Sequence, residues 1–330
     1  MAGNLKSVSV LMPARFYDRA AERILETFDA VLIDEMDPVL IPEEKRGEIV
    51  GMAALLGPEH VPVIDALPAL EIISNFGVGY HPVPSLHAIE KGICVTHTPD
   101  VLNEEVADTA LGVLLNTVRR FDRASEWLKS GQWEAKGSFA PSPLALRGRT
   151  VGIYGLGRIG KAVARRIEAF GLPVHYHNRN PAADVGYVWH DTLEGLAAAV
   201  DTLIVVVPGT PETRHTVNAG VLQALGPDGV LINIGRGPVV DEQALIAALK
   251  DGVIAAAGLD VFENEPHVPA ELVAMENTFL TPHIGSGSAY TRAAMGDLVA
   301  DNLVAWFSTG EAVTPVPEAK AKGLAKRKTG

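Results

Sequence analysis

Cysteine is almost absent from this chain of 330 residues, in which Cys94 is the only one. A single cysteine excludes an intrachain disulfide and a cysteine-based zinc site. Cys94 lies in the mainly apolar segment 92–96, which predicts a strand, so we expect a buried and packed thiol.

Long hydrophobic runs and an excess of positive charge are missing as well. No stretch approaches the roughly 18 apolar residues that a membrane-spanning helix needs, and the N-terminus contains no signal-peptide core. The 28 lysines and arginines are outnumbered by 40 acidic residues, and the net charge of −12 argues against a broad nucleic-acid surface. The basic segment 320–328 is short and terminal, so we expect a disordered end there. We therefore predict a cytoplasmic protein that binds neither membrane nor nucleic acid.

Short apolar runs, in contrast, are abundant. Hydrophobic residues make up 47% of the chain and glycine occurs 32 times, which fits a well-packed α/β protein of two domains. The first hundred residues contain five such runs, as expected for parallel strands buried on both faces, at 8–12, 31–34, 52–56, 72–76 and 93–96. Seven more follow at 151–154, 173–177, 186–189, 203–207, 230–234, 256–260 and 278–281. Helical patterns lie between some of these runs, which suggests βαβ units.

Three other segments carry predictions of their own. Apolar residues recur at helical spacing over residues 103–130, which predicts one long helix. Residues 131–143 are typical of an exposed loop or arm. An amphipathic helix predicted over residues 289–308 has no strand after it. This last helix can pack back on the first domain, which would make that domain discontinuous.

The strand at 151–154 leads directly into a glycine-rich turn and a helix. Gly155, Gly157 and Gly160 form the pattern G-x-G-x-x-G. Gly155 permits the tight turn, Gly157 lets the backbone approach a pyrophosphate, and Gly160 lets helix and strand pack closely. The pyrophosphate would bind at the helix N-terminus, where unpaired N–H groups and the macrodipole favour an anion. The arrangement predicts a dinucleotide-binding domain.

The next predicted strand ends at His177, 20 residues after Gly157, where NAD-binding proteins usually carry an acidic residue. Asn178 and Arg179 follow. No carboxylate is present to repel a 2′-phosphate, and a guanidinium is present to hold one. These residues favour NADP(H) over NAD(H), which stays possible. The alternative interpretation of Arg179 is a solvated loop cation.

Three polar residues follow later strands of the second series, namely Arg236, Glu265 and His283. If those strands are parallel, the three side chains emerge at the sheet edge where a nicotinamide would lie. Hydride transfer to a 2-keto acid needs a proton donor for the carbonyl oxygen and a fixed cation for the carboxylate. His283 is the natural donor, Glu265 can hold its other ring nitrogen, and Arg236 can bind a carboxylate in bidentate fashion. This chemistry requires no metal.

Each of the three residues also has a plainer interpretation. A histidine after a strand is more often structural, Glu265 can be a solvated loop carboxylate, and Arg236 can bond carbonyls in a turn. Their combination downstream of a cofactor motif favours catalysis.

The chain resembles the D-isomer-specific 2-hydroxyacid dehydrogenases, and within them the NADPH-dependent glyoxylate/hydroxypyruvate reductase branch. The similar motifs follow the family's order along nearly the whole chain, at residues 75–80, 98–102, 151–160, 207–214, 233–241, 258–266 and 281–286. Two features depart from the family pattern. His177 stands where NAD-using members carry Asp, and Tyr80-His81-Pro82 replaces the commoner Tyr-Asp-Asn.

The resemblance implies an α/β architecture of two doubly wound, Rossmann-like parallel sheets with the active site in the cleft between the domains. Residues 1–102 with 286–330 would form the substrate domain, and residues 103–285 the dinucleotide-binding domain. It also implies a homodimer through the cofactor domains, with the arm around residues 133–139 as part of the contact. An aromatic side chain of such an arm could reach the partner's active site, although Trp133 fits ordinary packing equally well.

The resemblance also assigns roles to individual residues. Arg236, Glu265 and His283 would be the catalytic set. The backbone amides of Val78 and Gly79 would hold the substrate carboxylate, and Arg236 and His283 would also bind the substrate. The residues expected to line the cofactor are Thr109, Gly155, Gly157, Arg158, Ile159, Gly160, His177, Asn178, Arg179, Val207, Pro208, Ile234, Gly235, Arg236, Asp260, His283 and Gly285.

The predicted function is the NADPH-dependent reduction of small 2-keto acids, glyoxylate and hydroxypyruvate first, to D-2-hydroxy acids. Bulkier acids such as phenylpyruvate or 2-ketogluconate remain an alternative. A non-enzymatic, corepressor-like sensor of NAD(P) is the alternative from another class.

Overall fold

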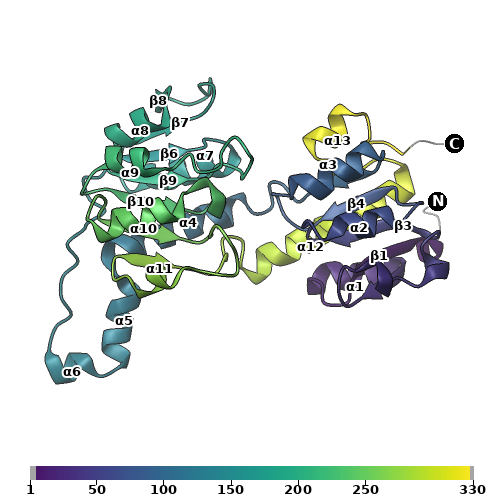
Figure 1. The fold of residues 1–330 in the computed structure, drawn as a ribbon, viewed down its shortest axis with the longest axis horizontal. Coiled ribbons are helices and arrows are strands. Elements are labelled where there is room, and N and C mark those ends of the chain that lie inside the picture. The colour runs from purple at the N-terminus through teal and green to yellow at the C-terminus, as the bar shows by residue number, and fades with distance from the viewer. Residues whose placement is uncertain (1–4, 328–330) are drawn as a thin grey trace. The chain divides into compact units, whose positions relative to one another are not determined.

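The computed structural model describes residues 5–327, and the chain divides into two compact units. One unit takes in the chain up to Leu102 and again from Ser288, and the other is Asn103–Gly287. Each unit is built on its own parallel sheet with helices on both faces (Figure 1). Among the described residues, none of the helices is long and apolar enough to cross a membrane.

The first unit contains a five-stranded sheet in the order β2-β1-β3-β4-β5. All neighbouring strands are parallel, and the strands are β1 (Ser9–Pro13), β2 (Asp29–Ile33), β3 (Ile49–Ala54), β4 (Ile72–Asn75) and β5 (Cys94–Thr96). The five predicted strands are confirmed with shifted ends. Cys94 is fully buried, and burial raises the pKa of its thiol to about 12, so the prediction of a packed thiol is confirmed.

The helices of this unit come from both ends of the chain. They are α1 (Asp18–Thr27), α2 (His60–Asp65), α3 (Pro82–Glu90), α12 (Ala289–Thr309) and α13 (Pro317–Ala321). Helix α12 packs against α1, where Arg23 forms ion pairs with Asp297 and Asp301 (3.0 and 2.8 Å). The predicted last helix is therefore confirmed, and it returns to the first sheet.

The prediction of a disordered basic tail is wrong as far as residue 327, and residue 328 lies outside the described part. Helix α13 lies here, Val316 donates its N–H to the carbonyl of Val95 (2.9 Å), and Leu324 is buried. Arg327 binds both carboxylate oxygens of Glu71 at 2.5 and 2.7 Å. The sequence did not reveal this structure because lysines dominate the composition of the segment. Long cationic side chains can stay solvated while the few apolar residues between them pack.

The second unit contains a seven-stranded parallel sheet in the order β12-β11-β10-β9-β6-β7-β8. Its strands are β6 (Val151–Tyr154), β7 (Val174–His177), β8 (Val188–His190), β9 (Thr202–Val205), β10 (Val230–Asn233), β11 (Ala256–Leu259) and β12 (Thr278–Leu280). The strand order reverses between β6 and β9. In open α/β sheets, ligands bind at the carboxyl ends of the strands beside such a reversal.

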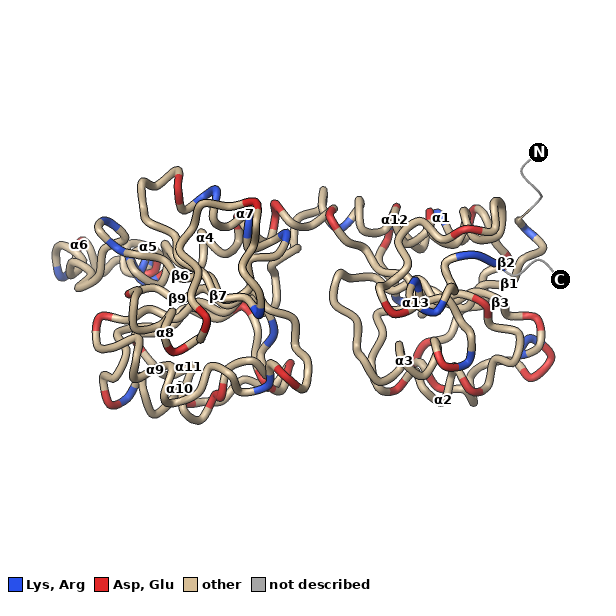
Figure 2. Tube along the Cα trace, turned by 90° about the horizontal axis from the view of Figure 1, so that it is seen from above, with Lys and Arg blue, Asp and Glu red and all other residues tan. Residues whose placement is uncertain are grey.

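Helices cover both faces of this sheet (Figure 1). They are α4 (Asn103–Arg119), α5 (Phe121–Lys129), α6 (Gln132–Lys136), α7 (Arg158–Ala169), α8 (Leu193–Ala199), α9 (Ala219–Leu225), α10 (Glu242–Lys250) and α11 (Ala270–Ala274). Acidic and basic residues are interspersed over both units rather than gathered by sign (Figure 2).

The single long helix predicted over residues 103–130 is wrong, because the chain breaks it at Arg120. Arg120 adopts the left-handed conformation (φ 55°), and its N–H closes α4 on the carbonyl of Asn116 (2.7 Å). Apolar spacing continues across the break, so periodicity alone cannot reveal it. The redirected α5, together with α6 inside the predicted loop, forms an arm that extends away from the sheet of its own unit (Figure 1).

Candidate active site

The glycine-rich turn between β6 and α7 has the geometry of a phosphate cradle. Gly155 has a φ of 105°, and a Cβ there would lie 2.8 Å from Val207 Cγ1. A Cβ on Gly160 would lie 2.2 Å from the carbonyl oxygen of Gly155. Gly157, in contrast, precedes α7 with open space where its Cβ would stand. The turn therefore requires two glycines for its own packing and leaves the third position clear for a pyrophosphate at the helix N-terminus.

The end of β7 carries the residues predicted to hold a 2′-phosphate. Nδ1 of His177 lies 2.8 Å from the carbonyl oxygen of His190. Because a carbonyl can only accept a hydrogen bond, Nδ1 is the donor, and Nε2 of His177 takes no part in this bond. Asn178 accepts the N–H of Leu156 with Oδ1 (2.7 Å), which ties the glycine-rich turn to β7. Arg179 is exposed, and none of the residues described hydrogen-bonds its guanidinium.

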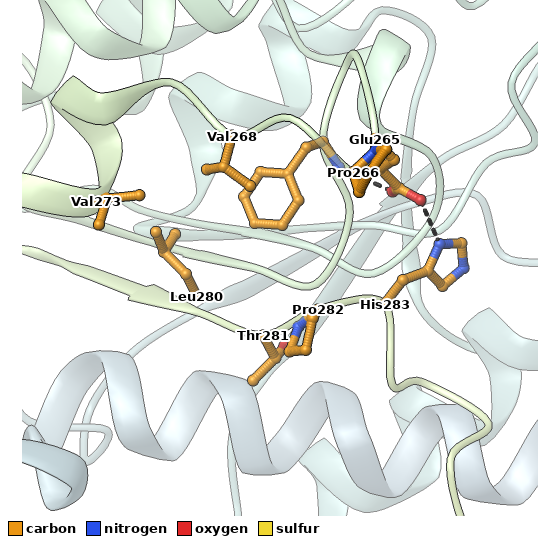
Figure 3. Close-up of a pocket in the computed structure, with 9 residues that line it drawn as sticks. Glu265, Pro266, Val268, Val273, Leu280, Thr281, Pro282 and His283 are labelled. Atoms are coloured by element: carbon orange, nitrogen blue, oxygen red, sulfur yellow. Dashed lines mark hydrogen bonds and ion pairs between the residues drawn. The ribbon is translucent and has the colours of Figure 1, made fainter.

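His283 and Glu265 are joined by a hydrogen bond, with Nδ1 2.7 Å from Oε2 (Figure 3). The second oxygen of Glu265 accepts the N–H of Phe262 (3.0 Å). Burial alone would raise the pKa of Glu265, but the hydrogen bonds from His283 and Phe262 and the positive charges of His283 and Arg236 bring it below its ordinary value. Glu265 is therefore a carboxylate at working pH, and Nδ1 of His283 must carry a proton.

The loop that carries His283 is held by a buried carboxylate at the end of the neighbouring strand β11. Asp260 accepts hydrogen bonds from the hydroxyl of Thr281 (2.7 Å) and from the N–H groups of Ile284 and Gly285 (both 2.8 Å). His283 itself has a φ of 51°, an uncommon backbone conformation for a residue with a side chain. Asp260 thus stabilises the backbone turn that presents the imidazole.

Arg236 follows β10 and lies close enough to Glu265 for their charges to interact. Its Nη1 donates to the carbonyl of Gly235 (2.6 Å), and its stem packs on Gly209, where a Cβ would lie 3.1 Å from Arg236 Cβ. Burial lowers the pKa of the guanidinium, and Glu265 raises it, yet an arginine remains protonated in a protein. The second unit thus brings a fixed cation and a histidine–carboxylate pair to one edge of its sheet.

An apolar pocket of about 330 Å³ adjoins the histidine–carboxylate pair. Figure 3 shows Glu265 and His283 at one end and Val273 and Leu280 at the other. Its walls are largely apolar, while the side chains of Glu265 and His283 stay partly exposed at its edge.

The loop after β4 in the other unit has the conformation of an anion-binding turn. Asn75 donates from Nδ2 to the carbonyls of Gly77 and Gly79 (3.2 and 3.4 Å), and Gly77 donates its N–H to Thr98 Oγ1 (3.1 Å). Over residues 5–327, the N–H groups of Val78 and Gly79 donate to no protein acceptor. Two neighbouring unpaired amides are suited to a carboxylate.

The other predicted cofactor residues of the second unit lie at strand ends or at the start of α7. Arg158 and Ile159 begin α7, Val207 and Pro208 follow β9, and Ile234 and Gly235 follow β10. The hydroxyl of Thr109 on α4 donates to the carbonyl of Gly285 (3.1 Å), so it supports the His283 loop. His81, which departs from the family pattern, accepts the N–H of Val83 (3.3 Å) and caps α3.

Sequence reasoning missed the residues that orient the site from behind. Asn75 and Thr98 shape the anion-binding turn, and Glu242 contacts the Glu265 loop through the N–H of Glu263 (2.6 Å). The available signal was a polar residue beside a strand end or helix start. That signal does not identify the hydrogen-bond partner, which depends on the tertiary position of another loop.

Comparisons with known proteins agree with this geometry. The model of the D-isomer specific 2-hydroxyacid dehydrogenase, NAD binding domain, matches residues 111–285. Glyoxylate/hydroxypyruvate reductase A HPR2 of Arabidopsis thaliana is 50% identical over 254 residues, which cover 77% of this chain and 80% of the plant protein. Hydroxyphenylpyruvate reductase of Plectranthus scutellarioides is 49% identical over 256 residues, with coverage of 77% and 80%.

A solved structure extends the similarity to both units. The NADPH-dependent glyoxylate/hydroxypyruvate reductase SmGhrB from Sinorhizobium meliloti, in complex with NADP and malonate, is 54% identical and has a TM-score of 0.93. The match covers 98% of this chain and 99% of the other. A likeness of this extent includes the two-sheet architecture as well as the cofactor-binding sheet.

The chain belongs to the D-isomer-specific 2-hydroxyacid dehydrogenase family. It is an NAD(P)-dependent 2-keto acid reductase, close to the glyoxylate/hydroxypyruvate reductases. The predictions of family, two-sheet α/β fold and enzyme class are thereby confirmed, and the similarity favours the enzyme over the non-enzymatic sensor.

Proposed function

We propose that this protein reduces glyoxylate and hydroxypyruvate to D-2-hydroxy acids with NADPH. The observation that carries the proposal is the 2.7 Å pair of His283 and Glu265, beside Arg236 at the edge of a dinucleotide-binding sheet. The relatives named for these two substrates support it.

The cofactor fits the glycine-rich turn, because an open position at Gly157 and the N-terminus of α7 can receive the pyrophosphate. When bound, the reduced nicotinamide supplies a hydride to the carbonyl carbon of the substrate. Arg179 and Nε2 of His177 are the groups we assign to the 2′-phosphate, while Asn178 holds the turn in place.

The protein's own part in the reaction is to bind the acid and to deliver a proton. Arg236 binds the substrate carboxylate and polarises the carbonyl. Because Nδ1 of His283 is committed to Glu265, only the imidazolium has a proton on Nε2 to donate to the carbonyl oxygen. The free amides of Val78 and Gly79 are further groups that we assign to the substrate carboxylate, with residues 1–102 and 286–330 as the proposed substrate domain and residues 103–285 as the proposed cofactor domain.

Turnover measured with NADPH and NADH in parallel, on glyoxylate and hydroxypyruvate, tests the proposal. Oxidation of NADPH at 340 nm with either acid supports it. Turnover with NADH alone would overturn the cofactor preference, and turnover with neither acid would overturn the substrate assignment.

Bulkier 2-keto acids form a second candidate, favoured by a pocket of about 340 Å³ at the carboxyl edge of the first sheet. Phe16, Tyr17, Met36 and Leu55 contribute apolar walls, and Arg15 is exposed at the pocket. The Tyr17 ring stacks on Phe76 (3.5 Å between centroids), which ties the pocket to the loop of Val78. Phenylpyruvate assayed beside hydroxypyruvate distinguishes the candidates by kcat/KM.

Replacing Arg179 with alanine should weaken NADPH binding by roughly tenfold or more, since a charge-assisted hydrogen bond contributes about 1.5–3 kcal/mol. NADH binding should change little, because NADH has no 2′-phosphate. Nucleotide fluorescence titration measures both, with the exposed Arg165→Ala on α7 as the control. Equal weakening of both cofactors would make Arg179 a solvated loop cation.

Replacing Glu265 with glutamine should move the alkaline limb of the kcat/KM profile to lower pH by about one unit, the lower end of the effect of a neighbouring opposite charge. The lowered pKa keeps Glu265 ionised across this range, so it favours the imidazolium throughout. Glutamine keeps a hydrogen-bond acceptor but removes the negative charge that stabilises the protonated donor. Glu271→Gln on the exposed face of α11 is the control, and an unmoved limb would contradict the role of Glu265.

We further propose a homodimer through the cofactor domains. The arm of α5 and α6 exposes Phe121, Leu128 and Trp133, and Trp133 is 61% exposed. Exposed apolar residues gathered on a projecting arm mark an association surface. Light scattering on the purified protein should give twice the monomer mass, and Trp133→Lys should lower it.

A further inference from the structure

Glu265 lies in a segment that has no helix or strand of its own. Glu263, Glu265 and Pro266 lie in turns and Asn264 forms an isolated β-bridge with His267, although Glu265 must hold His283 within 2.7 Å. A catalytic geometry on a loop requires supporting contacts, because an error of about 1 Å can cost 10²-fold in rate. The contacts that fix this segment therefore bear on the reaction.

One support is Glu242, the first residue of α10. It is 7% exposed, and its Oε1 accepts the N–H of Glu263 at 2.6 Å. The pKa of Glu242 lies above its ordinary value, chiefly because of burial. The hydrogen bond from the Glu263 N–H lowers this pKa, and the negative charges of Glu263 and Glu265 raise it. An acidic residue at a helix start gains from the macrodipole when fully solvated, so the helix alone does not require a buried carboxylate.

The same segment is fixed from two other sides. The carboxylate of Glu263 accepts hydrogen bonds from Nε2 of His215 (2.6 Å) and from Nη2 of Arg214 (2.7 Å). The backbone at Gly237 packs so closely that a Cβ there would lie 1.7 Å from the Phe262 carbonyl oxygen. Residue 263 is thus held by its N–H and by its side chain, two positions before Glu265.

We propose that Glu242 is a positioning residue for catalysis, which fixes the backbone of Glu263 and thereby sets the reach of Glu265 to His283. The inference rests on the proposed function, because it concerns the proton donor of that reaction. What Glu242 supplies is an acceptor oxygen at the correct distance. An uncharged side chain of the same length, glutamine, supplies one too, whereas aspartate keeps the charge but is one methylene shorter.

The test compares Glu242→Ala, Glu242→Asp and Glu242→Gln in the full chain, with the exposed Glu271→Ala as control. We expect the alanine and aspartate variants to lose roughly 10- to 100-fold in kcat with unchanged KM. Their alkaline limb should lie at lower pH than in the wild type. The glutamine variant should keep the kcat and the alkaline limb of the wild type. A carboxylate that only stabilised the fold would not predict this pattern.

Imidazole NMR of His283 gives a second readout that needs no turnover. The Nδ1–H signal of the hydrogen bond to Glu265 should persist in the glutamine variant and weaken in the alanine and aspartate variants. If Glu242→Ala prevents folding, the comparison of Glu242→Gln with Glu242→Asp still tests the proposal. Loss of thermal stability with an unmoved pH limb and an intact Nδ1–H signal would overturn the proposal, as would a glutamine variant as impaired as alanine. A wild type without keto-acid turnover would instead overturn the proposed function, and the NMR comparison would still judge Glu242.

Discussion

Replacing His283 with alanine is expected to lower kcat for glyoxylate reduction by about 10²- to 10⁴-fold, the usual contribution of a positioned general acid. The reason is geometric. Nδ1 of His283 donates to Glu265 at 2.7 Å, so Nε2 is the ring nitrogen left to donate a proton to the substrate under the proposed mechanism. Without the ring, the developing alkoxide has water as its only proton source.

The affinity for NADPH should remain close to that of the wild type, because the glycine-rich turn and the end of β7 do not depend on the imidazole. Fluorescence titration of NADPH and single-turnover kinetics separate the two effects. His267→Ala, an exposed histidine of the same unit, is the matched control. Turnover near the wild-type level in the His283 variant would show that another group is the acid.

Much of the architecture follows from the sequence, because parallel strands buried on both faces are short, continuous apolar runs. The end of a strand in an α/β sheet is also a functional location, so Arg236, Glu265 and His283 were foreseeable candidates. In the structure Glu265 and His283 lie at hydrogen-bond distance and Arg236 contributes its charge nearby. Their positions after strands of a parallel sheet are what made them candidates.

Other features could not be predicted, since each depends on a partner far along the chain. The break at Arg120 and the docking of Arg327 on Glu71 leave no periodic signal. Asp260 follows a strand as a cofactor-lining residue would, yet its carboxylate oxygens bind the His283 loop. A pattern shows that a polar side chain is available at a strand end, whereas only the fold shows which donor it meets.

Arg236 gives the second large effect. Replacing it with alanine should lower kcat/KM by about 10³-fold, since a bidentate contact loses two charge-assisted hydrogen bonds of about 1.5–3 kcal/mol each and each 1.4 kcal/mol is a factor of ten. Lysine should recover only part of the loss. Its ammonium is a strongly hydrated point charge that cannot form the bidentate contact, and the site of Arg236 is desolvated.

Chemical rescue separates this role from a structural one. Free guanidinium should restore part of the activity of the alanine variant, because it supplies the missing fork, while the wild type should gain nothing. Arg165→Lys, an exposed arginine paired with Glu104, is the control, since a surface ion pair contributes little. If the lysine variant keeps wild-type kcat/KM, the substrate carboxylate is bound elsewhere, and the amides of Val78 and Gly79 become the principal anchor. A different outcome is that guanidinium restores KM while kcat stays low. Arg236 would then act mainly by polarising the carbonyl, because its charge lies near Glu265 and so near the reacting centre.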